Sequence, residues 1–462
     1  MRQLDDSILR AYDIRGIVGE TLYEDDAYAI GRAFATMVAQ RKHCLNPIIC
    51  VGYDGRLTSP SLAKRLQEGL VDSGAVVYAI GLGPTPMVGV GVKVLQAHAG
   101  MMVTGSHNPP SHNGIKMMLH DGPFYGEDIQ ALGNMCRTAL FAEGHGRIEI
   151  KNIYTQYLQT LHEVLRGGAS LLTVAWDAGN GATGDMLSQL VQQLPGKHHV
   201  LNGQVDGTFP VHHPDPSVAE NLEQLIDTVK TMGCDLGIAF DGDGDRIGVV
   251  DHLGRIIEGD HLVAMLAKDV LDHHPGATII VDIKTSQPVL DYIQGEGGHP
   301  ILWKSGHSFI KAKMIETKAQ LAGEVSGHIF FADHFGFDDG LYAGVRLLSL
   351  LQRTGQSLAQ LYDALPKAMS TPEIRIDVKE SQKFGIIDAI KARLVQEQAS
   401  FIDIDGVRVQ TKQGWWLLRA SNTQAVLVMR CEAANNHDLH VLVTQCKGYL
   451  KAEGVSTDNI SG

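Results

Sequence analysis

The stretch IICVGYDG, residues 48–55, is an apolar run that ends in aspartate and glycine and leads into a polar turn and an amphipathic segment. The same pattern returns as LTVAWD at residues 172–177 and as TIIVD at residues 278–282. Short, continuous apolar runs of this kind are typical of parallel strands that are covered on both faces. We therefore expect three strand–loop–helix units, with helices over residues 186–194 and 284–293 in the second and third.

Each unit is followed by a second apolar run that ends in an unusual polar loop. Residues 99–103 lead into TGSHNPP, residues 234–240 into DGDGDR, and residues 319–322 into GEVSGH. Such loops lie where α/β sheets bind ligands, outside the carboxyl ends of the strands. The pattern predicts three topologically similar α/β domains, with chance similarity between strand–helix units as the alternative.

The pattern changes after Pro366 to an alternation that is typical of antiparallel strands. Residues 372–378, 401–409 and 415–430 alternate in this way, and Asp405-Gly406 forms the turn of the second segment. Helical patterns over residues 385–396 and 438–452 complete a smaller α+β domain. The predicted domains are residues 1–151, 152–255, 256–367 and 368–462.

The composition indicates a cytoplasmic globular protein that acts on small molecules. The net charge is −13, from 39 basic and 52 acidic residues, which argues against nucleic acid or an anionic membrane as the main partner. A local basic pocket can still hold an anionic substrate. The six cysteines form no C-x-x-C pair and are expected to be reduced thiols, and no signal peptide is apparent. The composition does not indicate an oligomeric state.

The loop at residues 241–246 carries three aspartates at alternate positions, Asp241, Asp243 and Asp245. Clustered carboxylates repel one another unless a hard cation lies between them, and ligation by oxygen alone suggests Mg²⁺. An EF-hand loop would need glycine and glutamate where this chain has Arg246 and His252, so that interpretation fails. A solvated acidic turn is the alternative. Arg246 is placed to contact an anion at the same site.

The loop at residues 104–110 offers Ser106 as a hydroxyl nucleophile, with His107 beside it and Lys116 ten residues later. Two prolines stiffen the exit of the loop. Because there is no G-x-S-x-G elbow, an acyl-transfer triad is disfavoured. Taken alone, the segment also fits an ordinary turn.

Two further loops offer groups that bind sugars and phosphates. Glu324 and Ser326 can hydrogen-bond to sugar hydroxyls, and His328 can act as an acid or base near neutral pH, with His307 shortly before them. A helix N-terminus with an exposed histidine is the alternative. The segment RASNT, residues 419–423, joins a guanidinium to short polar side chains and predicts a phosphate cradle, with a generic polar turn as the alternative.

Together these loops closely resemble those of the α-D-phosphohexomutase superfamily, and within it the bacterial phosphomannomutase/phosphoglucomutase group. The resemblance spans the chain, from AYDIRG at residues 11–16 through TGSHNPP, DGDGDR and GEVSGH to RASNT. It implies three similar α/β domains and a smaller fourth around a central cleft. It also implies an isomerase that interconverts the 1-phosphate and 6-phosphate of mannose or glucose through a phosphoserine and a bisphosphorylated sugar.

The resemblance implies a role for each loop. Ser106 would carry the phosphoryl group, and its phosphate, with Asp241, Asp243 and Asp245, would bind one Mg²⁺. Glu324 would bind sugar hydroxyls together with Ser326, while hexose 1,6-bisphosphate would be the intermediate and activator. The implied catalytic residues are Ser106, Lys116, Arg246, His328 and Arg15. The implied substrate-binding residues are Tyr12, Lys284, His307, Glu324, Ser326, Arg419, Ser421, Asn422 and Thr423.

Three other functions fit parts of the pattern. Phosphoglucosamine mutases typically read GEQSGH and R-x-S-G-T-E, so Val325 and Asn422 favour the hexose group. The run GIAFDGD, residues 237–243, looks like the start of a Mg²⁺-dependent aspartyl-phosphate hydrolase of the haloacid-dehalogenase type, although Asp245 stands where that family has Thr or Val. A non-catalytic sugar-phosphate sensor is disfavoured because no catalytic position is visibly lost.

Overall fold

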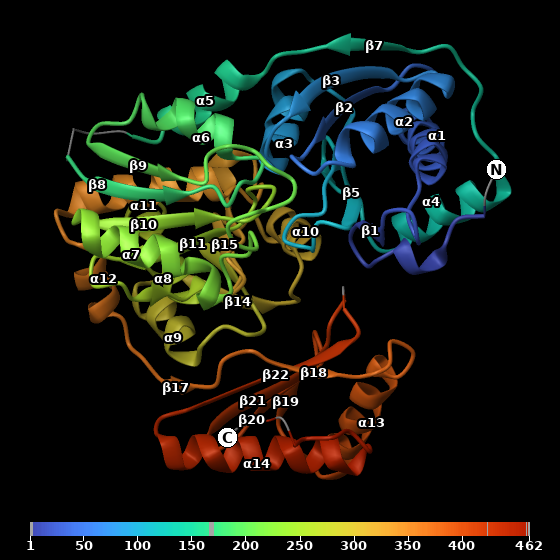
Figure 1. Ribbon diagram of the computed structural model, residues 1–462. Coiled ribbons are helices and arrows are strands. Elements are labelled where there is room, and N and C mark those ends of the chain that lie inside the picture. The colour runs from blue at the N-terminus through green and yellow to red at the C-terminus, as the bar shows by residue number, and fades with distance from the viewer. Residues whose placement is uncertain (1–2, 166–170, 423, 459, 461–462) are drawn as a thin grey trace.

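Four sheets and their helices make up the computed structural model, which describes residues 3–165, 171–422, 424–458 and 460 (Figure 1). The first three sheets lie beside one another, and the fourth, in red, lies below them in this view. The predicted class, three α/β domains with a smaller C-terminal α+β domain, is confirmed. Within the described residues, no helix has the length and apolar character needed to cross a bilayer.

The first sheet has the strand order β1-β5-β4-β2-β3-β7, with β6 paired to β5. Its strands are β1 (Ile14–Ile17), β2 (Ile48–Tyr53), β3 (Val76–Leu82), β4 (Ala99–Val103), β5 (His112–Leu119), β6 (Gly122–Pro123) and β7 (Arg147–Ile150). Its helices are α1 (Glu24–Lys42), α2 (Ser59–Asp72), α3 (Thr85–Val94) and α4 (Glu127–Thr138). A 3-10 turn, Asp6–Ile8, precedes β1.

The second sheet has the order β12-β11-β10-β8-β9 and the third has the order β14-β13-β15-β16. The second comprises β8 (Thr173–Asp177), β9 (Lys197–Leu201), β10 (Leu236–Phe240), β11 (Ile247–Asp251) and β12 (Ile256–Ile257), with α5 (Tyr154–His162), α6 (Gly184–Val191) and α7 (Glu223–Met232). The third comprises β13 (Thr278–Asp282), β14 (His299–Trp303), β15 (Leu321–Gly323) and β16 (Ile329–Phe331), with α8 (Gly259–His273), α9 (Gln287–Gly295), α10 (His307–Thr317), α11 (Gly340–Thr354) and α12 (Leu358–Ala364). Two more 3-10 turns are Ala219–Leu222 and Ala332–His334.

One topology recurs in the first three sheets. In each, the predicted first strand (β2, β8 or β13) lies between two parallel neighbours, and the second of these neighbours (β4, β10 or β15) pairs with an antiparallel strand (β5, β11 or β16). The sequence pattern predicted the parallel strands but not the antiparallel one. These antiparallel strands are largely buried, so they lack the clear alternation of a strand with one solvated face.

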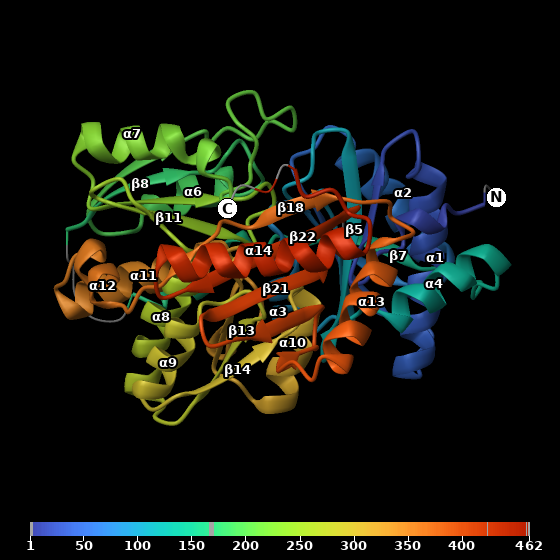
Figure 2. The same ribbon diagram turned by 90° about the horizontal axis from the view of Figure 1, so that it is seen from below.

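The fourth sheet is antiparallel, as predicted, with the order β17-β22-β21-β20-β19 and with β18 paired to β22. Its strands are β17 (Met369–Ser370), β18 (Ile374–Asp377), β19 (Phe401–Ile402), β20 (Val407–Gln410), β21 (Gly414–Ala420) and β22 (Val426–Ala433). Its helices α13 (Lys383–Gln396) and α14 (Asn436–Ala452) lie on the face that is turned away from the other sheets (Figures 1 and 2).

Two features of the elements differ from the sequence expectation. The helix expected over residues 284–293 begins at Gln287, because Pro288 suits the first turn of a helix, and the residues before it form a loop. The GEVSGH segment is a hairpin loop between β15 and β16 rather than a helix N-terminus. His307, in contrast, does open a helix, α10.

Buried apolar side chains join the first three domains. One cluster runs from α3 through the second sheet to α8 and α11, with Val90, Trp176, Phe240, Val263 and Leu347 among its members. The opposite face of the first sheet packs on α1, α2 and α4. The fourth domain has a separate core, so the molecule consists of a fused three-domain body and a docked fourth domain.

Candidate active site

All four predicted functional loops are hairpin connections. The loops of the first three domains join β4 to β5, β10 to β11 and β15 to β16, and the fourth joins β21 to β22. The first three meet between their domains, because a side chain of one loop contacts a side chain of another. Ser106 bonds to Asp241 of the second domain, and Arg246 of that domain bonds to His328 of the third.

Ser106 is buried, and its backbone has a φ of +50°, a left-handed conformation that is unusual for a residue other than glycine. Its Oγ donates to Asp241 Oδ2 at 2.8 Å and lies 3.2 Å from His107 Nδ1. Burial, followed by the nearby charges of Arg246 and Arg15, lowers the pKa of His107 well below its ordinary value. The Ser106 hydroxyl therefore lies between a carboxylate and a neutral imidazole.

The three aspartates of the second loop are fully buried and offer oxygens that lie within 4.8 Å of one another, so they could hold a metal ion. Among the described residues, Asp243 Oδ1 and Asp245 Oδ1 have no hydrogen-bond partner. Burial and the neighbouring carboxylates raise the pKa of Asp241 well above its ordinary value. A hard cation would relieve this repulsion and use the free oxygens, so the donor set fits Mg²⁺.

Lys116, on β5, extends its ammonium group into this cluster. Its Nζ donates to Asp243 Oδ2 at 2.7 Å and also to Asp245. Burial lowers the pKa of Lys116, but Asp243, Asp245 and Asp241 together outweigh burial and raise it above the ordinary value. Lys116 is therefore a permanent cation beside Ser106 and the aspartates.

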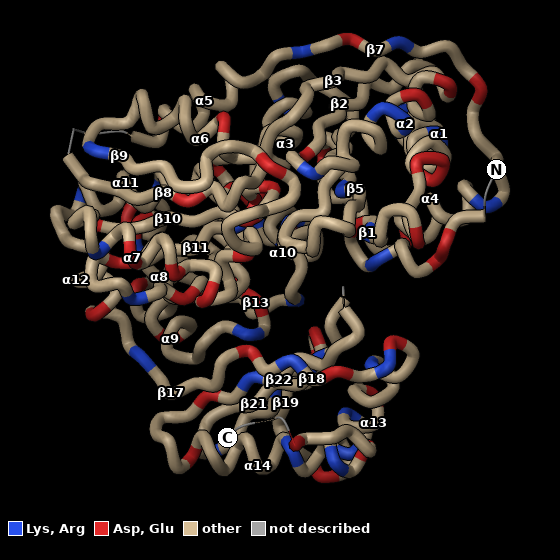
Figure 3. Tube along the Cα trace, viewed as in Figure 1, with Lys and Arg blue, Asp and Glu red and all other residues tan. Residues whose placement is uncertain are grey.

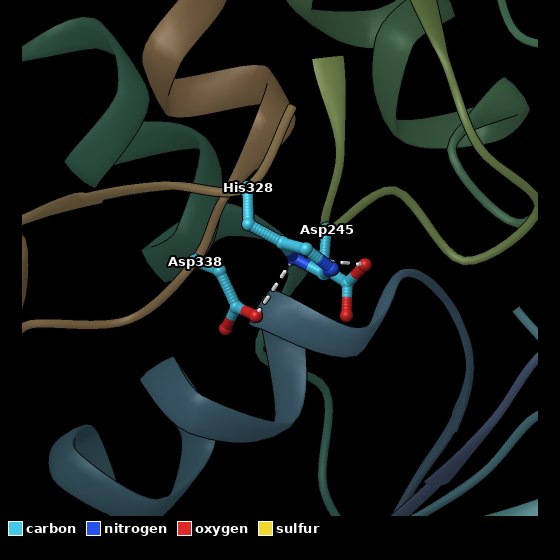
Figure 4. A group of neighbouring side chains, drawn as sticks. All are labelled: Asp245, His328 and Asp338. Atoms are coloured by element: carbon cyan, nitrogen blue, oxygen red, sulfur yellow. Dashed lines mark ion pairs between the residues drawn. The ribbon is translucent and has the colours of Figure 1, made fainter. Parts of the chain in front are cut away.

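His328 lies between two carboxylates from different parts of the chain (Figure 4). Arg246 Nε donates to His328 Nε2 at 3.0 Å, which assigns the ring proton of the neutral histidine to Nδ1. Nδ1 lies 3.1 Å from Asp338 Oδ2 and 3.6 Å from Asp245 Oδ1. The carboxylates thus face the Nδ1 side of the ring. The lone pair of Nε2 accepts the Arg246 N–H bond, so Nε2 can take a proton only when Arg246 turns away from it.

Residues of the first domain reach the same region. Arg15 Nη1 donates to Asn108 Oδ1 of the Ser106 loop at 2.8 Å, and its Nε pairs with Asp13 at 2.6 Å. Tyr12 makes an edge-to-face contact with His307, with ring centroids 5.0 Å apart. His307 in turn stacks at 5.9 Å on His328. The structure therefore brings Arg15, Tyr12 and His307 together with the first three loops.

The GEVSGH loop, residues 323–328, and the loop between β21 and β22 lie on the side of the site toward the fourth domain. Glu324 accepts from the Gly306 amide at 2.7 Å, and burial raises its pKa. Lys284 Nζ donates to Glu373 at 3.1 Å, and Arg419 Nε donates to Asp405 at 2.9 Å. The remaining predicted residues of this side are Ser326 in the β15–β16 loop and Ser421 and Asn422 in the β21–β22 loop. Thr423 lies outside the described residues.

Four of the cations of the site are already paired with acids. The pairs are Arg15 with Asp13, Lys116 with Asp243 and Asp245, Lys284 with Glu373, and Arg419 with Asp405. Over the whole molecule both signs of charge alternate along the trace, as Figure 3 shows. The site thus gathers basic groups within an acidic protein without leaving these buried charges uncompensated.

Several residues at the site had not been predicted from the sequence. Arg56, Asp338, Lys311 and Thr85 touch the predicted loops or their partners. Lys311 lies one helical turn after His307, a spacing that could have identified it. Asp338 carries no local signal, because only the tertiary fold brings it to His328.

Comparison with known proteins matches every domain of the chain to one family. Models of phosphoglucomutase/phosphomannomutase α/β/α domains I, II and III match residues 6–140, 152–254 and 258–369, and the C-terminal domain model matches residues 373–445. A phosphomannomutase/phosphoglucomutase of Pseudomonas aeruginosa is 45% identical over 447 residues, 96% of each chain. A phosphoglucomutase of Neisseria gonorrhoeae is 43% identical over 460 residues, 98% of each chain.

Among solved structures, a phosphoglucomutase/phosphomannomutase family protein of Burkholderia thailandensis superposes with a TM-score of 0.89 at 39% identity and covers 98% of this chain and 99% of its own. The sequence resemblance is thereby confirmed over the full length. The chain belongs to the phosphoglucomutase/phosphomannomutase family.

Proposed function

We propose that this protein is a phosphohexomutase that interconverts the 1-phosphate and 6-phosphate of mannose and glucose. The observation that carries this proposal is the placement of Ser106. Its Oγ lies 2.8 Å from Asp241, in a group that includes the buried Lys116 and His328 and the half-buried Arg246. Phosphoryl transfer depends on positioning and on stabilisation of charge, which such a group supplies.

In the proposed reaction, the bond between Ser106 Oγ and phosphorus breaks as a sugar hydroxyl oxygen bonds to phosphorus. His328 takes the hydroxyl proton at Nε2, while Lys116 and Arg246 neutralise the transferring group and Arg15 helps from the first domain. The product is hexose 1,6-bisphosphate, which reorients in the site and returns its other phosphoryl group to Ser106. The same bisphosphate would activate enzyme that has lost its phosphate.

One Mg²⁺ per chain fits Asp241, Asp243 and Asp245, with the Ser106 phosphate as a further ligand. The two free buried oxygens of Asp243 and Asp245 support this assignment. When bound, the ion would withdraw negative charge from the phosphoryl group.

The remaining residues would hold the substrate during transfer and reorientation. Glu324 and Ser326 would bind the sugar hydroxyls, with His307 and Lys284 nearby. The phosphate that is not reacting would bind Arg419, Ser421, Asn422 and Thr423, with Tyr12 beside them. Burial lowers the pKa of Arg419, but Asp405 and, to a smaller extent, Tyr12 outweigh burial and raise it, which supports a common site for Tyr12 and Arg419.

Labelling and mutation of Ser106 test the proposal. We expect enzyme incubated with ³²P-labelled glucose 1,6-bisphosphate to carry acid-stable label on the tryptic peptide that contains Ser106. Ser106→Ala should lose this label and at least about 10³-fold in kcat for glucose 1-phosphate and mannose 1-phosphate, because the covalent intermediate is removed. Its thermal unfolding should stay close to that of the wild type.

Other outcomes would contradict the proposal. Label on Asp241 would favour a hydrolase that works through an aspartyl phosphate, and near-normal turnover by Ser106→Ala would remove the assigned role. A kcat/KM for glucosamine 1-phosphate that exceeds the values for both hexose phosphates would favour a phosphoglucosamine mutase.

A further inference from the structure

A buried arginine behind the Ser106 loop plays no part in the chemistry proposed above. Arg56 follows β2 and is 1% exposed. Its Nη2 donates to the carbonyl oxygens of Ser106 at 2.7 Å and Asn108 at 2.5 Å. Its Nη1 donates to those of Pro109 at 2.6 Å and His112 at 3.0 Å. One planar guanidinium thus binds four carbonyls of the loop that carries the nucleophile.

Asp54 ties this arginine and the loop to the sheet. Its Oδ2 accepts from the Gly105 amide at 3.0 Å and lies 3.3 Å from Arg56 Nε. Its Oδ1 accepts from the Arg56 amide at 3.0 Å and from the Ser59 hydroxyl. The residue before Ser106 is therefore fixed to the end of β2 by the same carboxylate that orients Arg56.

Arg56 is closely packed by backbone from two domains. A Cβ on Gly105 would lie 2.4 Å from Arg56 Nε, so the loop rests directly on the guanidinium. A Cβ on Gly207, from the second domain, would lie 2.5 Å from Arg56 Cα. Phe209 of that segment covers the guanidinium at 5.1 Å. Arg56 is held between the Ser106 loop and the second domain, which also supplies the aspartate cluster.

Two physical properties of the Ser106 loop require contacts that hold its backbone conformation. The left-handed backbone of Ser106 is strained for a residue with a Cβ and persists only where the surroundings determine it. Phosphoserine, in addition, carries about two negative charges that carbonyl oxygens repel. Because the peptide group is planar and trans, the Ser106 carbonyl that points at Arg56 leaves the following amide N–H pointing away from it.

We propose that Arg56 is a positioning residue for phosphoryl transfer. Its guanidinium group binds the four carbonyls on the far side of the loop and so holds Ser106 in the strained conformation from which transfer occurs. This inference rests on the proposed role of Ser106 as the phosphoryl carrier. Lysine cannot replace the planar guanidinium group, because its ammonium is a compact charge that can bind fewer carbonyls at once.

The test compares Arg56→Lys with Arg32→Lys, a matched control. Arg32 is also a buried arginine of the first domain that donates to a backbone carbonyl, that of Ala142, but far from the site. Enzyme is labelled with ³²P at Ser106, and transfer of label to saturating glucose 1-phosphate is followed in a single turnover. We expect Arg56→Lys to slow this transfer about 10- to 100-fold, since misplacing a reacting group by about 1 Å has this effect.

The dissociation constant for glucose 1-phosphate should change less than about twofold in Arg56→Lys, because Arg56 does not face the sugar, and Arg32→Lys should transfer at the wild-type rate. If Arg56 only stabilised the fold, Arg56→Lys would not slow phosphoryl transfer while leaving the dissociation constant unchanged.

A second variant, Arg56→Ala, should recover transfer with millimolar guanidinium but not with methylammonium. If Arg56→Ala does not fold, Asp54→Asn, whose NH2 group must face either the Gly105 N–H or the Arg56 amide N–H, should show the same loss of transfer.

A transfer rate within twofold of the wild type in Arg56→Lys would overturn the inference, as would failure of guanidinium to restore folded Arg56→Ala. Absence of label from Ser106 in the wild type would instead refute the proposed function. The two failures are therefore distinguishable.

Discussion

At the scale of single residues, the site contains buried charges that are paired with acids. Lys284 and Glu373 are an example: the buried lysine follows β13 in the third domain, and the glutamate, with 28% of its side chain exposed, precedes β18 in the fourth. Removing one partner of such a pair leaves an uncompensated buried charge, which costs more than the pair itself contributes. Pairs of this kind also make stability depend on pH.

The Lys284–Glu373 pair predicts acid sensitivity. The ammonium of Lys284 lowers the pKa of Glu373 to about 2. Because the folded-state pKa lies below the unfolded value of about 4.3, the contribution of Glu373 is complete above pH of about 4.3 and is lost as the pH falls toward 2. Glu373→Gln should lower the free energy of unfolding by about 1–3 kcal/mol at pH 7, and this difference should shrink below pH of about 4.3.

Urea unfolding of the wild type and Glu373→Gln between pH 7 and pH 3 measures this difference. Glu316→Gln is the control, because Glu316 is an exposed partner of Lys313 and should contribute at most about 1 kcal/mol. A Glu373 difference that stayed constant across this range would contradict the pairing.

At the scale of elements, glycines let the hairpin loops approach one another. A Cβ on Gly242, in the aspartate loop, would lie 2.5 Å from the Ser106 carbonyl oxygen. This contact joins the Ser106 loop to the loop of the candidate metal site without a side chain between them. Gly242 therefore has a structural use, because it lets the two loops approach this closely.

Gly242→Ala should separate the two loops. We expect kcat to fall about 10-fold or more, since the reacting groups would be displaced by a fraction of an ångström to about 1 Å. Gly448→Ala, in the interior of α14, is the matched control, because nothing lies within 4 Å of its Cβ and alanine favours a helix. Steady-state kinetics and melting temperatures of both variants check this prediction, and full activity of Gly242→Ala would contradict it.

At the scale of the whole molecule, three domains share a core and the fourth is docked onto the third. The docking combines apolar and polar contacts: Ile283 of the third domain packs on Trp415 and Leu417 of the fourth. Arg408, fully buried in the fourth domain, donates to the carbonyls of Ile283 at 2.9 Å and Thr285 at 2.8 Å, and Arg430 donates to that of Lys284 at 3.0 Å. These bonds hold the loop that bears Lys284 and so link the placement of the fourth domain to the site.

Arg408→Lys should weaken this docking. Two buried carbonyls would lose the donor of their hydrogen bonds. Each carbonyl left without a partner should lower the free energy of unfolding by about 1–3 kcal/mol. We expect calorimetry to show an earlier unfolding transition for the fourth domain and kinetics to show a raised KM for glucose 1-phosphate. Arg393→Lys, which alters an exposed pair with Glu397 on α13, should change neither. A single unshifted transition in Arg408→Lys would contradict this account of docking.

Local patterns were sufficient for much of the fold. The apolar runs at residues 48–54, 172–177 and 278–282 formed the central strands of three similar sheets, and each ended in a buried aspartate. The four loops, with their serine, aspartates, glutamate and arginine, were found from residue type and spacing. The domain divisions near residues 151, 255 and 367, the Mg²⁺ site and the cytoplasmic location stay predictions.

The sequence by itself thus determined the fold class and the repeated units and predicted the loops of the candidate site, because apolar periodicity and motif spacing are local properties of the chain. Only the tertiary structure decided which groups meet. Lys116 lies beside Asp243, 127 positions along the chain, and Arg56 lies behind Ser106 across 50 positions. Such contacts depend on how buried strands pair and how domains pack. A strand that is buried on both faces is a uniform apolar run in the sequence, and this run does not indicate which distant residue it will contact.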